Sequence, residues 1–475
     1  MRAMDKALTS AIAANRFGLG ARPGELAASR GAGPDWLRSQ LEGPAPSIAG
    51  QGLQSSASIL AQIYDLRRSI RAERLRVPVG GSDRGSAAAI GAFRKLAQLI
   101  RPIYIAEAGA RFRQSVATGR PFIERLTHFW SNHFAVSVDK SVLAALAGSY
   151  EREAIRPYVL GNFSDLLLAT ERHPAMLLYL DNQASMGPDS RAAHHIARRN
   201  AGRKTGINEN LARETMELHT VGVAGGYTQR DVTAFAEVLT GWSIAGPASR
   251  WLGAQPGTFL FRAAMHEPGA QVMMGKRYPD EGYDQGVAVL RDLASRPATA
   301  RFIALKLARH FVADEPPAPV VARVAAAFSR SGGDLPTVYR ALIDSPEAWQ
   351  QPLAKYKTPS DFILSAFRGL ELPVRGDRAP VGLFQLLGQR IWGPGSPAGW
   401  PDRSADWDGA AELLERIEWA DAVGQRLASG RDALALAPQM LGGVLSGATR
   451  EAIAHAESAA QAIALLLASP EFMRR

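Results

Sequence analysis

The sequence predicts a mainly α-helical protein, and three observations lead to that prediction. Apolar residues recur at the three- and four-residue spacing of amphipathic helices through most of the chain. Groups of glycine and proline separate these stretches. Strand-like patterning is confined to the region from Trp242 to Lys276. With 475 residues, 46% of them hydrophobic, the chain can form one large multi-helical domain or two helical subdomains, with one small β-hairpin.

Composition and charge exclude several classes of function. Cysteine is absent, which removes disulfides, thiolate nucleophiles and cysteine-ligated zinc. The net charge is +10, but basic residues are scattered among acidic ones and no zinc-finger or RNA-recognition signature occurs, so we expect no nucleic-acid partner. A polyanionic ligand or an acidic glycan is compatible with this charge.

The chain carries no membrane or export signal of the usual kinds. No stretch of 18 apolar residues occurs, so we expect no membrane span. The first 26 residues contain neither an apolar run long enough for a signal-peptide core nor a twin-arginine motif. From the sequence alone we expect a cytoplasmic protein.

The first part of the chain is predicted to be a series of helices separated by loops. Pro102 predicts a kink inside one of these helices. The polar segment Val79–Ser86 is predicted to be a linker. The predicted helices are Ala7–Ala14, Pro34–Leu41, Ser55–Arg76, Ala87–Ser115, Pro121–Phe134, Glu151–Tyr158 and Phe163–Thr170.

The second half contains the predicted hairpin and a further series of helices. Thr258–Phe261 and Val272–Met274 are predicted to be strands on either side of a turn at His266–Gly269. The helices predicted after it are Gln285–Ser295, Ala298–Phe311, Ala318–Ser331, Leu335–Asp344, Ser360–Gly369 and Val381–Leu387. We expect three parts: an N-terminal helical segment (1–80), a central helical domain (87–345) and a C-terminal helical subdomain (346–475).

Two polar features precede the centre of the chain. Glu124, His128 and Asn132 are spaced to share one face of a helix, while His133 lies on the other face among apolar residues. A histidine in that setting is more often a hydrogen-bonded core residue than a ligand. Asp181 follows an apolar run, where it either forms a helix-terminal turn or holds a carboxylate at a cleft.

The stretch from Asn208 to Trp242 carries the densest set of reactive side chains. At roughly 100° per residue, Asn210, Arg213, Glu214 and Glu217 share one arc of a predicted helix, with His219 on the opposite side. A glycine-rich segment ends this helix, and Thr228 with Asp231 predicts a capping box for the next one. The arc can serve acid–base chemistry, or it can be a solvated face with an Arg213–Glu217 ion pair.

Two loops allow functional and structural interpretations. The segment from Gln183 to Gly206 is polar and basic, so it is either a clamp for an anionic ligand or, more often for such segments, a solvated loop. The segment from Trp392 to Pro401 places Trp392 and Trp400 among glycines and prolines. These tryptophans can stack on sugars or on a partner, or they can fill a gap in the core.

No high-specificity catalytic motif is present, and the histidine and carboxylate spacings do not require a metal or a cofactor. The best chemical interpretation is a paired-carboxylate site of Glu214, Glu217 and Asp181, in which one carboxyl acts as acid while its neighbour stays ionised. The predicted substrate-binding residues are Arg213, His133, Asn132, Asn210, His219, Trp242 and Gln229.

Eight segments, taken in order, resemble the bacterial family catalogued as domain of unknown function 1800. They are NRFGLGARP (15–23), HFWSNHFAVS (128–137), HPAMLLYLDN (173–182), NENLARETMELHTVGVAGGYTQRDV (208–232), LTGW (239–242), PATARFIALKLARHFV (297–312), GWP (399–401) and SPEF (469–472). No established reaction comes with the family. The resemblance implies that these residues occupy motif positions: Asn132, His133, Asp181, Asn182, Asn208, Glu209, Asn210, Arg213, Glu214, Glu217, His219, Gly226 and Gln229.

The resemblance also implies a partner. Members are often encoded beside an exported protein of the sulfatase/phosphatase-like type, so a periplasmic location, reached in a complex with that partner, is an alternative to the cytoplasm. Two functions therefore stand as expectations. The first is a hydrolase or lyase on a glycan or other polyhydroxylated polymer, with Glu214 as general acid/base. The alternative is a non-catalytic helical scaffold that escorts the exported partner.

Overall fold

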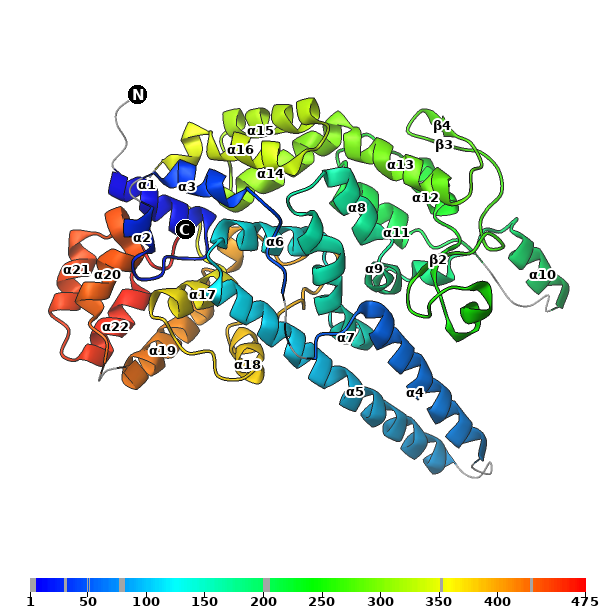
Figure 1. Ribbon diagram of the computed structural model, residues 1–475, viewed down its shortest axis with the longest axis horizontal. Coiled ribbons are helices and arrows are strands. Elements are labelled where there is room, and N and C mark those ends of the chain that lie inside the picture. The colour runs from blue at the N-terminus through cyan, green and yellow to red at the C-terminus, as the bar shows by residue number, and fades with distance from the viewer. Residues whose placement is uncertain are drawn as a thin grey trace.

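The computed structural model describes residues 6–29, 32–48, 50, 52–76, 82–199, 206–350, 353–427 and 430–475. Within these ranges the chain forms 22 α-helices and two small antiparallel sheets (Figure 1), which confirms the mainly α-helical prediction. Residues 79–81 of the predicted linker and residues 200–205 of the predicted basic loop lie outside the described residues. Residues 82–86 of the predicted linker are not a loop, because they belong to the helix Ser82–Ala117. None of the helices in the described ranges is long and apolar enough to cross a membrane.

The helices before residue 220 correspond closely to the periodic stretches of the sequence. Pro121 and Pro174 begin two of them, where the missing backbone N–H is not needed. Two long helices, α4 and α5, project together from the body of the molecule in Figure 1. The helices are α1 (Lys6–Ile12), α2 (Glu25–Ala28), α3 (Gly33–Gln40), α4 (Ser56–Arg76), α5 (Ser82–Ala117), α6 (Pro121–His133), α7 (Ser141–Tyr150), α8 (Phe163–Glu171), α9 (Pro174–Tyr179), α10 (Arg191–Arg199) and α11 (Asn210–Glu214).

The helices after residue 220 begin with the predicted capping box, in which the Thr228 and Asp231 side chains each bond to the other's backbone N–H. Three later helices have a one-way cap, in which a side chain accepts from a backbone N–H of the first turn; the capping residues are Asp334, Ser446 and Ser458. These helices are α12 (Gln229–Val238), α13 (Tyr283–Ser295), α14 (Pro297–Phe311), α15 (Ala318–Ser331), α16 (Leu335–Ile343), α17 (Pro359–Gly369), α18 (Arg378–Leu386), α19 (Ala410–Leu427), α20 (Ala433–Leu441), α21 (Gly447–Ala454) and α22 (Ala459–Ala468).

Both predicted strands are present, but they do not pair with each other. β2 (Phe259–Phe261) pairs with β1 (Trp242–Ile244), and β3 (Gln271–Met273) pairs with β4 (Lys276–Tyr278). The reason is local: the turn between β3 and β4 needs only two residues, whereas the chain from β2 to β3 is too long for a tight hairpin. The segment expected as a basic loop also contains a helix, α10.

Two clusters of buried apolar residues form the interior. The first extends along the chain from Ile12 to Leu353. The second contains residues from Tyr356 to Met473, together with Leu19, Ala108 and Phe112. The first cluster ends and the second begins close to the boundary expected at 345–346. The division of the chain into three parts stays a prediction.

The segment NRFGLG connects the two clusters through its backbone. The buried guanidinium of Arg125 donates to the carbonyl of Gly18 at 2.5 Å, and that of Arg368 donates to the carbonyl of Gly20 at 2.9 Å. Gly20 has φ +90°, and a Cβ there would lie 2.5 Å from the Cβ of Ser365. A glycine is therefore required, because any side chain would force α17 away from this segment.

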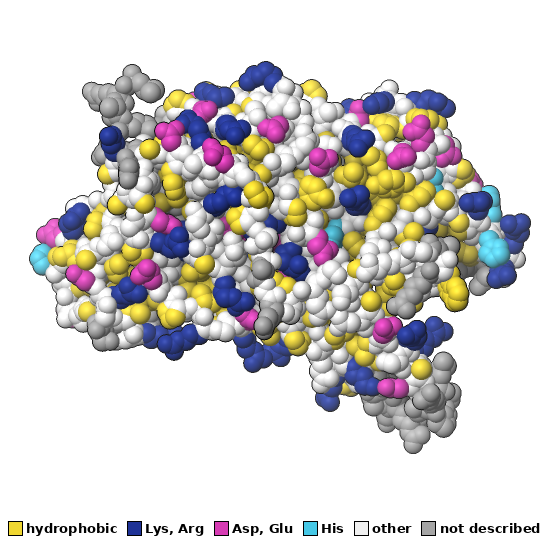
Figure 2. All heavy atoms as spheres, in the orientation of Figure 1, with side chains coloured by type: hydrophobic (Ala, Val, Ile, Leu, Met, Phe, Trp, Pro, Cys, Tyr) yellow, Lys and Arg dark blue, Asp and Glu magenta, His cyan; other side chains and the backbone are white. Residues whose placement is uncertain are grey.

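The surface carries mixed charge. Figure 2 shows basic and acidic side chains interspersed over the face drawn, without a field of one sign. This agrees with the scattered basic residues of the sequence.

Candidate functional site

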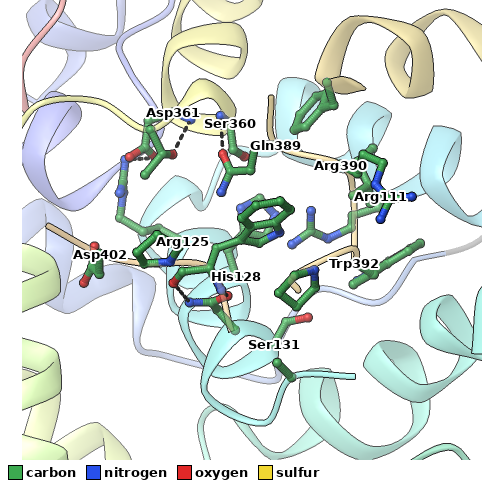
Figure 3. Close-up of a pocket in the computed structure, with 18 of the residues that line it drawn as sticks. Arg111, Arg125, His128, Ser131, Ser360, Asp361, Gln389, Arg390, Trp392 and Asp402 are labelled. Carbon is green, nitrogen blue, oxygen red and sulfur yellow. Dashed lines mark hydrogen bonds and ion pairs between the residues drawn. The ribbon is translucent and has the colours of Figure 1, made fainter. Parts of the chain in front are cut away.

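A polar pocket of about 100 Å³ lies between the two apolar clusters. Helices α5, α6, α14 and α17 line it, together with the segment from Phe384 to Asp402. Figure 3 shows Arg125, Asp361 and Asp402 on one side and Arg111, Arg390 and Trp392 on the other. Residues that are far apart in the sequence therefore build one site.

Helix α6 supplies the floor of the pocket. His128, Ser131 and Asn132 line it, and Glu124 lies one turn earlier, fully buried. Arg156 binds Glu124 with both terminal nitrogens, at 2.7 and 2.8 Å, and this pair fixes the first turn of α6. Burial, assisted by Arg111, lowers the pKa of His128, so this imidazole is neutral at pH 7.

Asn132 attaches the tryptophan-containing segment to α6. Its Oδ1 accepts a hydrogen bond from the backbone N–H of Trp400 at 2.7 Å, and its Nδ2 donates to the carbonyl of Trp400 at 2.9 Å. Gly399 has φ +82°, and a Cβ there would clash with the carbonyl oxygen of Asn132. The Gly-Trp-Pro sequence is therefore needed for this close approach, and Asn132 positions the pocket wall.

We expect Asn132→Ala to lower the free energy of unfolding by about 1–3 kcal/mol, because both backbone groups of Trp400 lose their partner in a half-buried place. Chemical denaturation followed by tryptophan fluorescence measures the change. Asn132→Asp is the matched comparison, since it retains the acceptor and removes the donor. A loss no larger than that of an exposed change such as Asn210→Ala would contradict the anchoring role.

Trp392 is held in a strained backbone conformation at the rim of the pocket. Its φ is +51°, which is unusual for a bulky residue. The conformation is retained because its carbonyl accepts from the Val138 N–H at 2.9 Å and its indole donates to Glu151 at 3.0 Å. The guanidinium of Arg111 lies over the indole, 5.4 Å from its centre. Strain of this kind concentrates at functional sites.

The opposite wall is a network of buried ion pairs. Asp361 contacts Arg125 at 2.8 Å and Arg475 at 2.7 Å. Asp402 accepts from His310 Nδ1 at 3.2 Å and lies 3.5 Å from the Lys355 ammonium. These contacts join α6, α14 and α17 to the last residues of the chain, so the wall is rigid.

The charged groups of this network shift one another's pKa values. Burial alone would raise the pKa of Asp361, but Arg125 and Arg475 outweigh it and hold that pKa well below its usual range. The pKa of Asp402 is lowered in the same way, with His310, Lys355 and Arg475 outweighing burial. Burial lowers the pKa of His310 to about 4. At neutral pH the pocket therefore contains ionised carboxylates and two neutral imidazoles, those of His128 and His310.

We expect acid to destabilise the protein through these carboxylates. A carboxyl whose folded-state pKa is depressed contributes stability above its unfolded pKa, about 4, and loses it as the pH falls toward the folded value. Asp361, Asp402 and Glu124 all have this sign. The free energy of unfolding, measured by urea titration, should fall steadily below about pH 4. A constant value between about pH 4 and pH 2 would contradict the ion-pair assignment.

Several polar groups at the pocket have no partner in the described part of the chain. The indole N–H of Trp400 and the Nε2 of His310 are buried without a hydrogen bond. Gln389 uses its Oε1 to accept from the Ser360 N–H at 2.8 Å, and its NH₂ group is free among the described residues. Arg111 donates through Nε to Glu151 at 2.8 Å, which leaves its two terminal nitrogens. The free groups are mostly donors, with one imidazole nitrogen.

The arc predicted on the central helix forms a surface network around Glu209. Arg213 contacts Glu209 at 2.9 Å and Glu217 at 3.4 Å, and it donates to Gln229 at 2.9 Å. Thr233 and Gln229 donate to Glu209 and lower its pKa. Three predicted site residues therefore lie together in the structure, around Glu209. They are Arg213, Glu217 and Gln229. Asn210 is exposed beside this network.

Glu214 differs from its neighbours. It is partly buried, and no hydrogen bond or ion pair to it occurs among the described residues. Burial raises its pKa; His219 opposes the shift and Glu217 adds to it. A raised pKa is the direction expected of a general acid.

We expect Glu214→Gln to leave the melting temperature unchanged or slightly raised. A carboxyl with a raised folded-state pKa costs stability at pH values above its unfolded pKa, and glutamine removes that cost without removing a partner. Differential scanning calorimetry at pH 7 and pH 4 measures it, since the gain should shrink at the lower pH. A large drop in melting temperature would instead indicate a structural acceptor.

His133 and His219 are buried together in the first cluster. His133 Nε2 bonds to the carbonyl of His219 at 3.1 Å, and His219 Nδ1 bonds to Glu171 at 2.6 Å. Burial lowers the pKa of His133 well below its usual value. The chain from Thr215 to His219 is a π-helical turn, which is wider than an α-helical one and directs His219 inward toward Glu171.

The side chains of the remaining predicted residues do not meet at one site. Asp181 has φ +57° and an exposed carboxylate paired with Lys140 at 2.6 Å. Asn182 is buried and donates to the carbonyls of Leu239 and Trp242 at 3.1 Å each. The indole of Trp242 is buried in the core. Of the predicted site residues, only Asn132 lines the polar pocket.

The sequence had two signals for this pocket. The spacing of Glu124, His128 and Asn132 placed them on one helical face, and the Trp392–Pro401 segment was an alternative stacking surface. Other charged residues of the pocket could not be recognised from the sequence, because each is a single residue in a separate helix or loop. Examples are Arg111, His310, Asp361 and Asp402. Among the described residues, no group of three or more histidines, aspartates or glutamates is arranged to hold a metal ion.

Fold and site together define a mainly helical protein with a strained, donor-rich pocket between two apolar cores. Three of the sequence segments contribute to this architecture: NRFGLG at the junction, the α6 motif at the floor and Gly-Trp-Pro at the wall. The chain belongs to the family described as protein of unknown function (DUF1800), whose model matches residues 12–474. No curated protein and no solved structure matches the chain.

Proposed function

We propose that the protein is a lyase that acts on an acidic glycan, and that a carboxylate of the substrate enters the polar pocket. The observation that carries the proposal is the set of free donors beside a neutral histidine. Arg111, Gln389 and Trp400 offer N–H groups without protein partners in the described residues. A carboxylate accepts such bonds through both oxygens, and charge-assisted bonds are the strong ones.

The size of the pocket supports binding of one end of a ligand. A volume of about 100 Å³ is small beside the ~300–1,000 Å³ of sites that enclose a whole small molecule. It suits a carboxylate and the carbons next to it, while the rest of a polymer lies along the rim. Trp392, at the rim, offers an aromatic face to a sugar ring.

His310 is the proposed base. Its Nδ1 faces Asp402, a pairing that keeps the proton on Nδ1 and leaves the lone pair on Nε2. An ionised Asp402 also stabilises the imidazolium that forms when Nε2 takes a proton. In the free protein, the positive charges of Arg125 and Arg475 help to lower the pKa of His310. A bound carboxylate would offset these charges and raise that pKa toward neutrality.

The reaction that fits these groups is β-elimination. Donors around the carboxylate stabilise the negative charge that develops when His310 removes the proton from the adjacent carbon. The electron pair forms a carbon–carbon double bond, and the glycosidic C–O bond on the next carbon breaks. The leaving oxygen takes the proton that the imidazolium releases, so protons balance. Hydrolysis by paired carboxylates fits this pocket less well, since Asp361 and Asp402 are both held in ion pairs.

A screen of polymers tests the proposal. The full chain is incubated with polygalacturonate, alginate and hyaluronate, and with dextran as a neutral control, while the ultraviolet absorbance of an unsaturated uronate is recorded. We expect one acidic polymer to be cleaved and dextran to be left intact. Gln389→Glu should abolish cleavage, because it keeps the acceptor for Ser360 and repels a carboxylate. Cleavage of dextran, or full activity of Gln389→Glu, would refute the proposal.

A paired-carboxylate hydrolase centred on Glu214 is the second enzymatic candidate, favoured by the raised pKa of that carboxyl. Its weakness is that Glu217 is engaged by Arg213 and Asp181 by Lys140. Reducing ends that appear without unsaturated product, and that disappear in Glu214→Gln, would identify this reaction.

The escort role is supported by a different observation. Trp251 is 93% exposed, and exposed tryptophans are frequent anchors in protein interfaces. We propose that an exported sulfatase/phosphatase-like partner would bind there. Co-purification from the native host should recover the partner with the wild type and lose it with Trp251→Ser. Equal recovery with both proteins would exclude this surface.

A further inference from the structure

A second cavity, of about 740 Å³, lies on the C-terminal side of the molecule. It is bounded by α5, α17, α18 and α19, the last three of which lie together in Figure 1. Its walls are apolar: Phe112, Phe367, Leu383, Trp419 and Val423 all face it. The cavity opens to solvent, since Leu386 in its lining is 57% exposed. A concave, mostly apolar surface of this size is typical of small-molecule sites.

Two arginines stand at this cavity without counter-charges. Arg375 and Arg426 line it, and neither makes an ion pair within the described residues. The acidic residues near Arg375 in the sequence are engaged elsewhere, Glu371 with Arg431 at 3.3 Å and Asp377 with Arg113. Both arginines are exposed, so the cavity combines apolar walls with positive charge on its solvent side.

We propose that this cavity binds an amphiphile with an alkyl chain and an anionic headgroup, of the fatty-acid class. The chain lies against Phe112, Phe367 and Trp419, and the headgroup is held by Arg375 and Arg426. A volume of about 740 Å³ falls within the ~300–1,000 Å³ of small-molecule sites. The cavity shares no lining residue with the polar pocket, so the proposal goes beyond the lyase function.

Gly382 provides a variant that fills the cavity. It lies in α18 and lines the hollow, and a Cβ built there meets no atom within 4 Å. The backbone at Gly382 therefore accepts a side chain, and Gly382→Phe is designed to place a ring in the space that the alkyl chain would occupy. Gly382→Ala is the matched control, because it also removes the glycine from the helix and adds only a methyl group.

Calorimetry on the full chain tests the proposal with dodecanoate, dodecyltrimethylammonium and butanoate, each below its micellar concentration. We expect dodecanoate to bind, and the cation and the short acid to bind at least about tenfold more weakly. Gly382→Phe should abolish binding while Gly382→Ala retains it. The double variant Arg375→Gln/Arg426→Gln should weaken dodecanoate binding about tenfold, since it removes charge-assisted bonds, while the exposed Arg378→Gln should not.

Several results would overturn the proposal. Equal affinity for dodecanoate and dodecyltrimethylammonium would show that the arginines do not bind the headgroup. Dodecanoate binding that survives in Gly382→Phe would place the ligand elsewhere. Light scattering tests whether a second copy of the chain fills the cavity instead. A wild-type dimer that Gly382→Phe converts to a monomer would show that it does. Failure of dodecanoate to bind at all would also refute it.

Discussion

Asp361→Asn is expected to lower the free energy of unfolding by about 3–5 kcal/mol, the largest loss that we expect from any single substitution. Asparagine has nearly the shape of aspartate, so the cost comes from charge. Asp361 contacts Arg125 at 2.8 Å and Arg475 at 2.7 Å, and both guanidiniums are almost completely buried. The change leaves two buried positive charges without their shared counter-ion, at the junction between α6 and α17.

The matched control is an ion pair at the surface. Asp35 contacts Arg38 at 2.5 Å, but its side chain is 76% exposed. Asp35→Asn should therefore cost no more than about 1 kcal/mol. Both variants are compared with the wild type by chemical denaturation at pH 7. If Asp361→Asn costs no more than Asp35→Asn, the network does not hold α6 and α17 together.

His310→Asn is expected to lower turnover by about 10²–10⁴-fold, once a cleaved polymer is known. Asparagine can still direct an N–H toward Asp402, as Nδ1 does, so the wall of the pocket is preserved. The change removes Nε2, the nitrogen that is proposed to take the proton. The expected loss is in kcat, with KM nearly unchanged, because the carboxylate is bound by other residues.

Glu214→Gln is the comparison that separates the two candidate sites. It should leave the lyase activity as in the wild type, since Glu214 does not line the polar pocket. The pH dependence adds a second readout, because a base such as His310 makes kcat fall on the acidic side of its pKa in the complex. If Glu214→Gln abolishes turnover while His310→Asn does not, the reaction belongs to the helix α11 carboxyl.

Much of the fold was predictable from local pattern. The periodic stretches became helices, the Thr228–Asp231 capping box formed, and the one strand-like region contains the strands. Each of these features depends on residues within a few positions of one another. The pairing of the strands was not predictable in the same way, because it depends on which segments meet in space.

The site was less predictable, for the same physical reason. The central polar arc attracted a catalytic interpretation because its residues are close in sequence, yet Arg213 and Gln229 gather around Glu209 at the surface. The pocket instead combines side chains from Arg111 to Asp402, whose proximity exists only after the two cores have packed. Only the polar face of α6 and the segment from Trp392 to Pro401 could be recognised as parts of the pocket from residues close together in the sequence. The predicted separation on the central helix is nevertheless present, because His219 is buried whereas Glu214 and Glu217 are only partly buried.

The central claim is that the polar pocket binds a carboxylate. Isothermal titration of the full chain with galacturonate, and with galactose as the neutral analogue, tests it most directly. We predict that galacturonate binds, that galactose does not, and that Gln389→Glu, which puts a negative charge beside the free donors of Arg111 and Trp400, abolishes the binding. Equal binding of the two sugars, or galacturonate binding that Gln389→Glu leaves intact, would contradict the account.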